Sequence, residues 1–182
     1  MKQILIHLAE GFEEIEAITI IDVLRRAGLN VNTVSVTGNL MVKGAHKIEV
    51  KADRLFEDVD YSTGMMIVLP GGMPGAKNLN EHKELGRQII EYHDNDKYLA
   101  AICAAPLVFG NLGILKGKRA VCYPGFETQL TGAKVGILPY MVDKKVITGR
   151  GIGAALQFSL EIVKILIGEE QSVQLKKDML IE

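Results

Sequence analysis

Two side chains of the sequence could act as sulfur nucleophiles, Cys103 and Cys122. Cys103 follows a short apolar run at residues 99–102 and precedes Pro106, a residue favoured in the first turn of a helix. The thiol is therefore expected at a strand-to-helix turn, where free N–H groups and the helix dipole can lower a cysteine pKa well below its usual value of about 8.5. This position predicts a thiolate nucleophile at neutral pH. An inert cysteine packed in the core is the alternative.

Cys122 ends the apolar segment 119–122 and precedes Tyr123-Pro124-Gly125, with no helix start directly after it. It lacks the turn that would activate a thiol, so we expect a structural or secondary role. Two cysteines cannot form a disulfide framework, and no Cys or His lies at the short spacing of a zinc site. Both thiols are therefore expected to be free.

A carboxyl group is expected on the inner face of the first helix. Positions four apart share one face of a helix, and this face carries Phe12, Glu16, Ile20 and Leu24. Burial raises the pKa of a carboxylic acid, and a protonated Glu16 can donate a hydrogen bond to a thiolate or pass on a proton. A side chain that escapes to solvent beside the positive end of the helix dipole is the alternative.

Glycines follow the strand predicted at residues 65–69. Gly71 and Gly72 let backbone N–H groups approach a bound atom, which suits an oxyanion hole, although an isolated pair fits an ordinary Pro-Gly turn better. The glycine-rich turn at residues 149–155 only superficially suggests dinucleotide binding, because that fingerprint belongs in the first βαβ unit, where this chain has acids that would repel a pyrophosphate. Close packing of a helix on a strand explains these glycines better. Arg150 is a candidate anion or dimer contact.

Apolar β-branched runs alternate with amphipathic stretches along the chain. This alternation predicts an α/β fold with a doubly wound, mostly parallel sheet and helices on both faces, where sites form at the carboxyl ends of strands. Alternating residues near Val42 and at 48–51 predict a small antiparallel excursion, from which His46 could reach the site. Predicted strands cover residues 3–8, 30–36, 65–69, 98–102 and 119–122, predicted helices cover 13–27, 82–93, 104–112 and 153–167, and a hairpin joins 141–142 to 146–148.

Composition and charge exclude several classes of partner. The net charge is −1, from 21 Lys+Arg and 22 Asp+Glu, and the sequence contains no basic block. It therefore indicates no positively charged surface that would bind nucleic acid or anionic lipid. The apolar run at residues 4–6 is too short, and too closely followed by acids, to be a signal peptide or a membrane span. We therefore expect a cytoplasmic protein with one domain over residues 1–182.

In their order along the chain, these pieces resemble the ThiJ/PfpI superfamily, and most closely its branch of parkinsonism-associated, glyoxalase III-like deglycases. The resemblance spans nearly the whole sequence. Each motif is modest alone, but four in the family's order are specific. The motifs are Glu13-Glu14-Ile15-Glu16, Leu69-Pro70-Gly71-Gly72, Ala101-Ile102-Cys103-Ala104 and Thr148-Gly149-Arg150-Gly151.

The resemblance implies a flavodoxin-like fold of the class I glutamine amidotransferase-like type, a homodimer, and no metal or organic cofactor. It implies that Cys103 is the nucleophile and Glu16 its protonated partner. Gly72 and Ala104 would supply the oxyanion N–H groups. Tyr123 stands where the deglycase branch often has a histidine, so a Cys–His pair is not carried over to this chain. Protease-like members have a histidine directly after the nucleophile, where this chain has Ala104, which disfavours a cysteine peptidase.

Two functions follow from this resemblance. The first is a cofactor-free glyoxalase or deglycase, acting on small 2-oxoaldehydes or on early glycation adducts of proteins. The second is an oxidative-stress sensor or chaperone-like protein, in which peroxide converts Cys103 to a sulfinic acid. Both require the same reactive thiol, and a hydrolase or lyase for another small molecule rests on the fold alone. The candidate oxyanion and substrate-binding residues are Gly71, Gly72, Ala104, Tyr123, His46 and Arg150.

Overall fold

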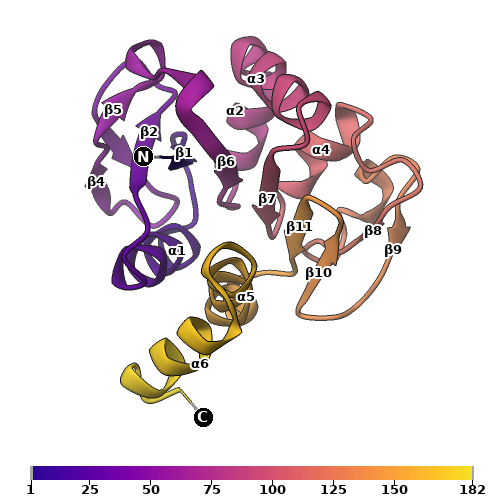
Figure 1. The fold of residues 1–182 in the computed structure, drawn as a ribbon. Coiled ribbons are helices and arrows are strands. Elements are labelled where there is room, and N and C mark those ends of the chain that lie inside the picture. The colour runs from indigo at the N-terminus through magenta and orange to yellow at the C-terminus, as the bar shows by residue number, and fades with distance from the viewer. Residues whose placement is uncertain (1, 182) are drawn as a thin grey trace.

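The computed structural model describes residues 2–181 and contains a central seven-stranded sheet (Figure 1). Its strands are β1 (Gln3–Leu8), β2 (Val31–Ser35), β5 (Arg54–Leu55), β6 (Gly64–Leu69), β7 (Tyr98–Ile102), β10 (Tyr140–Asp143) and β11 (Val146–Gly149). They lie in the order β10-β11-β7-β6-β1-β2-β5, and every neighbouring pair is parallel except β10 with β11. The predicted mostly parallel α/β sheet is confirmed.

Helices cover both faces of the sheet (Figure 1). They are α1 (Glu14–Arg26), α2 (Gly75–Glu81), α3 (Lys83–Asp94), α4 (Pro106–Asn111), α5 (Ala155–Ile167) and α6 (Glu169–Asp178). The first helix packs beside α5 on one face, while α2, α3 and α4 cover the other. Within residues 2–181, no helix combines the length and the apolar character needed to cross a membrane.

The sheet separates two apolar clusters, because successive side chains of a strand point to opposite faces. In β1, Ile4 and Ile6 join the cluster under α1 and α5, whereas Leu5 joins the cluster under α3 and α4. All three are at most 1% exposed. Burial on both faces explains why the central strands are continuous apolar runs.

Two small sheets lie outside the central one. The predicted antiparallel excursion is confirmed as β3 (Met41–Lys43) paired with β4 (Glu49–Lys51). The strand predicted at 119–122 is wrong in its length, because only β8 (Arg119–Ala120) is extended, paired with β9 (Lys134–Val135). Cys122 therefore lies in the segment after a short strand.

One helix prediction needs correction, and two further helices were not predicted. The helix predicted at 104–112 is the six-residue α4, since residues 103–105 form the turn that precedes it. Helix α2 was missed, because the glycines and prolines before it indicate a loop. Helix α6 was also missed, because Gly168, with φ 106°, ends α5 and redirects the chain into a further helix.

Candidate active site

Cys103 occupies the turn between the carboxyl end of β7 and α4. Its φ of 63° lies in the left-handed region, which is uncommon for a residue with a side chain. Two backbone hydrogen bonds hold this conformation: the Cys103 N–H donates to the Gly149 carbonyl at 2.9 Å, and the Tyr123 N–H donates to the Cys103 carbonyl at 2.8 Å. The residue is half-buried. The sequence-predicted turn therefore presents this thiol at the end of the sheet.

Glu16 faces the interior from the first turn of α1, as the helical spacing predicts, and is 0% exposed. Its Oε2 accepts the Gly71 N–H at 2.9 Å, and its carboxyl group also meets the thiol of Cys103. Burial raises the pKa of Glu16 to about 7. Its Oε1 has no hydrogen-bond acceptor or donor partner among the described residues. A proton on this oxygen would turn an uncompensated buried acceptor into a donor.

The glycine turn after β6 allows the acid and the thiol to approach each other. A Cβ at Gly71 would lie 2.5 Å from Cys103 Cβ and 2.7 Å from Glu16 Oε2, so only glycine fits between them. Gly72 follows with a φ of 91°, in the region that glycine adopts readily. Its N–H and that of Ala104 both act to lower the pKa of Cys103. These two donors are the ones named for the oxyanion hole.

The expected lowering of the Cys103 pKa is wrong in direction. Burial, followed by the nearby Glu16 carboxylate, raises the pKa of Cys103 to about 12, and the N–H groups of Gly72 and Ala104 oppose this rise only in part. The sequence-based expectation did not include the loss of water around the buried sulfur, which disfavours the thiolate. It also relied on a helix N-terminus, whereas α4 is short and begins only at Pro106.

Glu16 and Cys103 therefore behave as one titrating pair rather than as two independent groups. When Glu16 is ionised, its charge opposes a thiolate. When Glu16 holds the proton, that repulsion disappears and the acid can donate its O–H to the sulfur. The protonation of Glu16 thus determines whether Cys103 can be a nucleophile.

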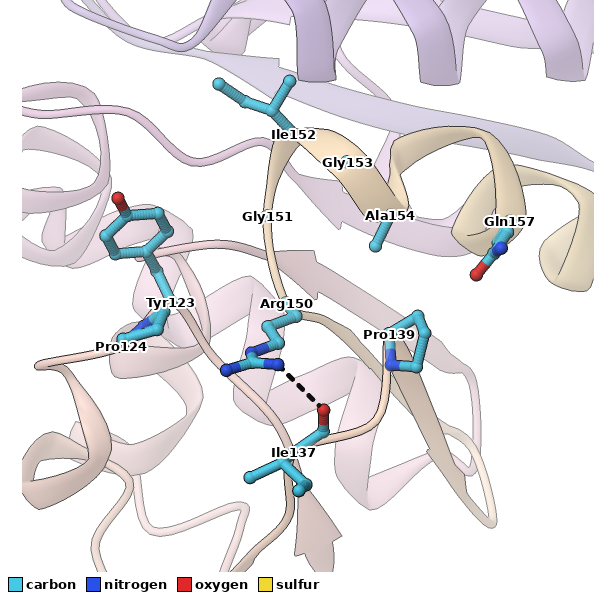
Figure 2. Close-up of a pocket in the computed structure, with 10 residues that line it drawn as sticks. All are labelled: Tyr123, Pro124, Ile137, Pro139, Arg150, Gly151, Ile152, Gly153, Ala154 and Gln157. Carbon is cyan, nitrogen blue, oxygen red and sulfur yellow. Dashed lines mark hydrogen bonds between the residues drawn. The ribbon is translucent and has the colours of Figure 1, made fainter.

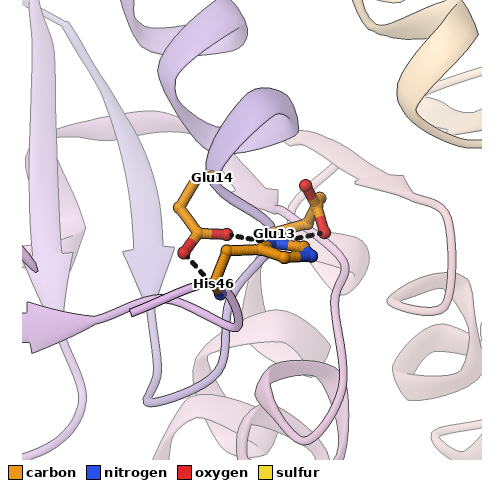
Figure 3. Close-up of side chains that lie close together, drawn as sticks. All are labelled: Glu13, Glu14 and His46. Carbon is orange, nitrogen blue, oxygen red and sulfur yellow. Dashed lines mark hydrogen bonds and ion pairs between the residues drawn. The ribbon is translucent and has the colours of Figure 1, made fainter. Parts of the chain in front are cut away.

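His46 belongs to a separate contact between the β3–β4 hairpin and the start of α1 (Figure 3). Its ring Nδ1 lies 2.9 Å from Glu14 Oε2 and 3.7 Å from Glu13 Oε2. The backbone N–H of His46 donates to Glu14 Oε1. The ring is 68% exposed, and the Glu14 hydrogen bond raises the pKa of His46. Within residues 2–181, this is the one trio of His, Cys, Asp or Glu side chains close enough to share a metal ion. The Ile48 N–H also donates to Glu14, so this carboxylate ties the hairpin to the helix.

Tyr123 and Arg150 lie on a pocket that borders the Cys103 turn (Figure 2). Tyr123 contacts Cys103 through its backbone, while its ring faces the pocket. The Arg150 guanidinium donates to the Ile137 carbonyl at 3.1 Å. The structure thus gathers five predicted residues around the sulfur: Cys103, Glu16, Gly71, Gly72 and Ala104. It places Tyr123 and Arg150 on the adjoining pocket and His46 in the separate contact with Glu14.

Sequence reasoning missed two features of this region. Glu14 was given no role of its own, but it is buried and holds the hairpin. The apolar segment Ile137-Leu138-Pro139 was assigned no role, although two of its residues line the pocket. The available signal was a group of large apolar residues outside any predicted strand or helix.

Replacing Gly71 by Ala should disable the site without unfolding the protein. The added methyl group would force Cys103 and Glu16 apart, and displacements of this size can cost about 100-fold in rate. We expect alkylation of Cys103 by iodoacetamide, followed by mass spectrometry, to change by a comparable factor. Gly86→Ala is the matched control, because its Cβ would make only an ordinary contact at 3.6 Å. Equal alkylation rates in the Gly71→Ala and wild-type proteins would contradict the geometry.

Replacing Glu16 by Gln should alter how stability depends on pH. The pKa of Glu16 is raised from 4.5 to about 7 on folding, so its stabilising contribution is complete below pH 4.5 and is lost as the pH rises toward 7. The free energy of unfolding of Glu16→Gln relative to wild type should therefore increase by about 2–3 kcal/mol between pH 4.5 and 8. Urea unfolding at several pH values measures this. Repeating the comparison in a Cys103→Ser background isolates the acid, and a flat difference would disprove the raised pKa.

Comparison with known proteins agrees with this fold. The pattern of the DJ-1/PfpI family matches residues 2–165. Arabidopsis thaliana protein DJ-1 homolog B is 39% identical over 175 residues, which cover 95% of this chain but only 40% of that longer protein. The glutathione-independent glyoxalase DJR-1.2 of Caenorhabditis elegans is 33% identical over 172 residues, covering 93% of this chain and 91% of that protein.

A solved structure provides an independent comparison. Oxidised DJ-1 of Toxoplasma gondii superposes with a TM-score of 0.94 at 35% sequence identity, covering 99% of this chain and 98% of that one. Membership of one family explains both the flavodoxin-like architecture and the order of the four motifs along the chain. The chain belongs to the DJ-1/PfpI family.

Proposed function

We propose that this protein is a cofactor-free, cysteine-dependent glyoxalase that converts small 2-oxoaldehydes to 2-hydroxy acids and acts as a deglycase on early glycation adducts. The observation that carries the proposal is the meeting of one sulfur, one buried acid and two N–H groups at Cys103. The glyoxalase name of the C. elegans relative supports the same chemistry. A free, reactive thiol is compatible with the reducing cytoplasm, where we propose that the protein acts.

The first step is attack by the Cys103 thiolate on the aldehyde carbon. A carbon–sulfur bond forms, and the carbonyl π electrons move to the oxygen. The N–H groups of Gly72 and Ala104, which favour negative charge at the Cys103 sulfur, are the proposed donors to this oxyanion. The proton on Glu16 then passes to the oxyanion and completes a hemithioacetal.

Glu16 next acts as the base. Now ionised, its carboxylate removes the proton from the former aldehyde carbon, and an enediolate forms with its charge on the former ketone oxygen. The same proton returns to the neighbouring carbon and the remaining hydroxyl proton moves to the charged oxygen, which leaves a thioester of the 2-hydroxy acid on Cys103. Water hydrolyses this thioester and releases the acid and the thiol. The net change is the addition of one water molecule, so neither an oxidant nor a reductant is consumed. A pKa near 7 suits a group that must both donate and accept a proton at neutral pH.

Purified protein should convert methylglyoxal to lactate without added metal or glutathione, and Cys103→Ser should abolish this conversion. Glu16→Gln should also lose turnover, because an amide cannot accept the proton, while it keeps a thiol that iodoacetamide can alkylate. Lactate is measured with an enzymatic assay specific for the product. Cys122→Ser serves as the control for loss of a thiol in general. A wild-type rate no better than that of Cys103→Ser would remove the enzymatic proposal.

Redox sensing is the second candidate function, favoured by the same donors around the sulfur. A sulfinate on Cys103 would accept hydrogen bonds from Glu16 and from the Gly72 and Ala104 N–H groups. The T. gondii relative was solved in an oxidised form, which agrees with such chemistry in the family.

Mild peroxide should add two oxygen atoms to Cys103 before it modifies Cys122. Cys122 is only 4% exposed, whereas Cys103 is half-buried. Peptide mass spectrometry after a timed peroxide exposure identifies the modified residue. Glu16→Gln should change the rate at Cys103 and leave that at Cys122 unaltered. Earlier oxidation of Cys122 would refute the sensing proposal.

We also propose that the protein is a homodimer, with α1 and the β3–β4 hairpin at the interface. Ile15, Ile18 and Ile48 are 55%, 44% and 57% exposed, and such grouped apolar side chains mark contact surfaces. Sedimentation should give twice the chain mass of 19.9 kDa, and Ile18→Glu should yield the single-chain mass. Ile90→Glu, on the exposed side of α3, should leave the dimer intact. A monomer at micromolar wild-type concentration would contradict this assignment.

A further inference from the structure

A pocket of about 420 Å³ lies beside the Cys103 turn and has no role in the chemistry described so far (Figure 2). Its walls come from the segment after β8, the β9–β10 loop, and the turn from β11 into α5. Arg150 lies among the labelled side chains in Figure 2, with Tyr123 and Pro124 on one side and Pro139 on the other. The pocket is thus built by three separate segments between residues 123 and 157.

Two of these walls are joined directly to the nucleophile. The Tyr123 N–H donates to the Cys103 carbonyl, and the Gly149 carbonyl, one residue before Arg150, accepts the Cys103 N–H. The walls are also close to each other, since a Cβ at Gly151 would lie 3.2 Å from the Tyr123 ring. The pocket therefore adjoins the backbone of the nucleophilic residue.

The lining of the pocket is mostly carbon with one cation. Apolar surface comes from Ile137, Pro139 and Ile152, and polar groups from Arg150 and Gln157. Among residues 2–181, no carboxylate lies within 4.0 Å of the Arg150 guanidinium, which donates only to the Ile137 carbonyl. The remaining N–H groups of this fork match the oxygens of a carboxylate or phosphate. A concave apolar wall with one free guanidinium is typical of a site for an amphipathic anion.

We infer that this pocket binds the non-reacting end of the substrate, an apolar body that terminates in a carboxylate or phosphate held by Arg150. The inference rests on the proposed function for the attack by Cys103 and adds the class of substrate. A three-carbon oxoaldehyde carries no anionic group that could pair with Arg150. Methylglyoxal is therefore the minimal substrate, and larger anionic 2-oxo compounds or glycation adducts with a nearby carboxylate are the preferred ones.

The test uses matched alkylating probes, so that it does not depend on turnover. N-(iodoacetyl)glycine and N-(iodoacetyl)-6-aminohexanoate carry a carboxylate at two distances from the reactive carbon, and their amides are the neutral controls. The rate of Cys103 alkylation is measured for each probe by mass spectrometry. For at least one length, the ratio of anionic to neutral rates should fall about tenfold in Arg150→Gln. Arg150→Lys should restore part of the ratio.

Arg87→Gln removes one positive charge from α3, far from the pocket walls in sequence, and controls for the change in net charge. It should leave the ratio unchanged. A phosphonate probe, N-(iodoacetyl)aminomethylphosphonate, distinguishes the two anion classes. If the pocket prefers phosphate, the Arg150-dependent ratio of anionic to neutral rates is larger for this probe than for the carboxylate probes. Ratios unaffected by Arg150→Gln at both lengths would overturn the inference. Intact ratios in a protein that does not convert methylglyoxal would overturn only the glyoxalase proposal.

Discussion

The close approach of the Glu16 carboxyl group to the Cys103 sulfur is the interaction on which the rest of the site depends. Burying an ionised carboxylate completely costs free energy unless hydrogen bonds or an opposite charge compensate for the lost water. Glu16 has no exposed surface, and one of its oxygens accepts the Gly71 N–H while the other lacks a hydrogen-bond partner among the described residues. The sheet, the glycine turn and α1 together impose this arrangement. Because Gly71 has no side chain, the turn can lie between the acid and the thiol without separating them.

The inward orientation of Glu16 could be read from the sequence, since helical spacing alone sets which residues share a face with Phe12 and Ile20. The parallel sheet was equally predictable, because strands buried on both faces are continuous apolar runs. The position of Cys103 between β7 and α4 followed from local residue types. Each of these inferences uses information contained within a few turns of the chain.

The electrostatics of Cys103 could not be predicted in the same way. Its pKa depends on burial by segments distant in sequence, and on a carboxylate that arrives from the first helix across the glycine turn. The residues next to Cys103 in the sequence indicate the N–H donors but not how deeply the sulfur is buried. The sequence therefore predicts a lowered pKa for Cys103, whereas burial raises it. His46 illustrates the same limit. Its ring is paired with Glu14, a contact made only because the β3–β4 hairpin folds back onto α1.

The two cysteines pack on opposite sides of the central sheet. Cys103 contacts the apolar cluster under α1 and α5, whereas Cys122 belongs to the cluster under α3 and α4. Both residues nevertheless lie beyond the ends of their strands, and the Tyr123 N–H, one residue after Cys122, donates to the Cys103 carbonyl. No other cysteine is present in the sequence, so a sulfenic acid on Cys103 is resolved either by Cys122 or by a thiol from another molecule. A sulfinic acid, by contrast, is not reduced by thiols, so the form with two added oxygen atoms persists once it is made.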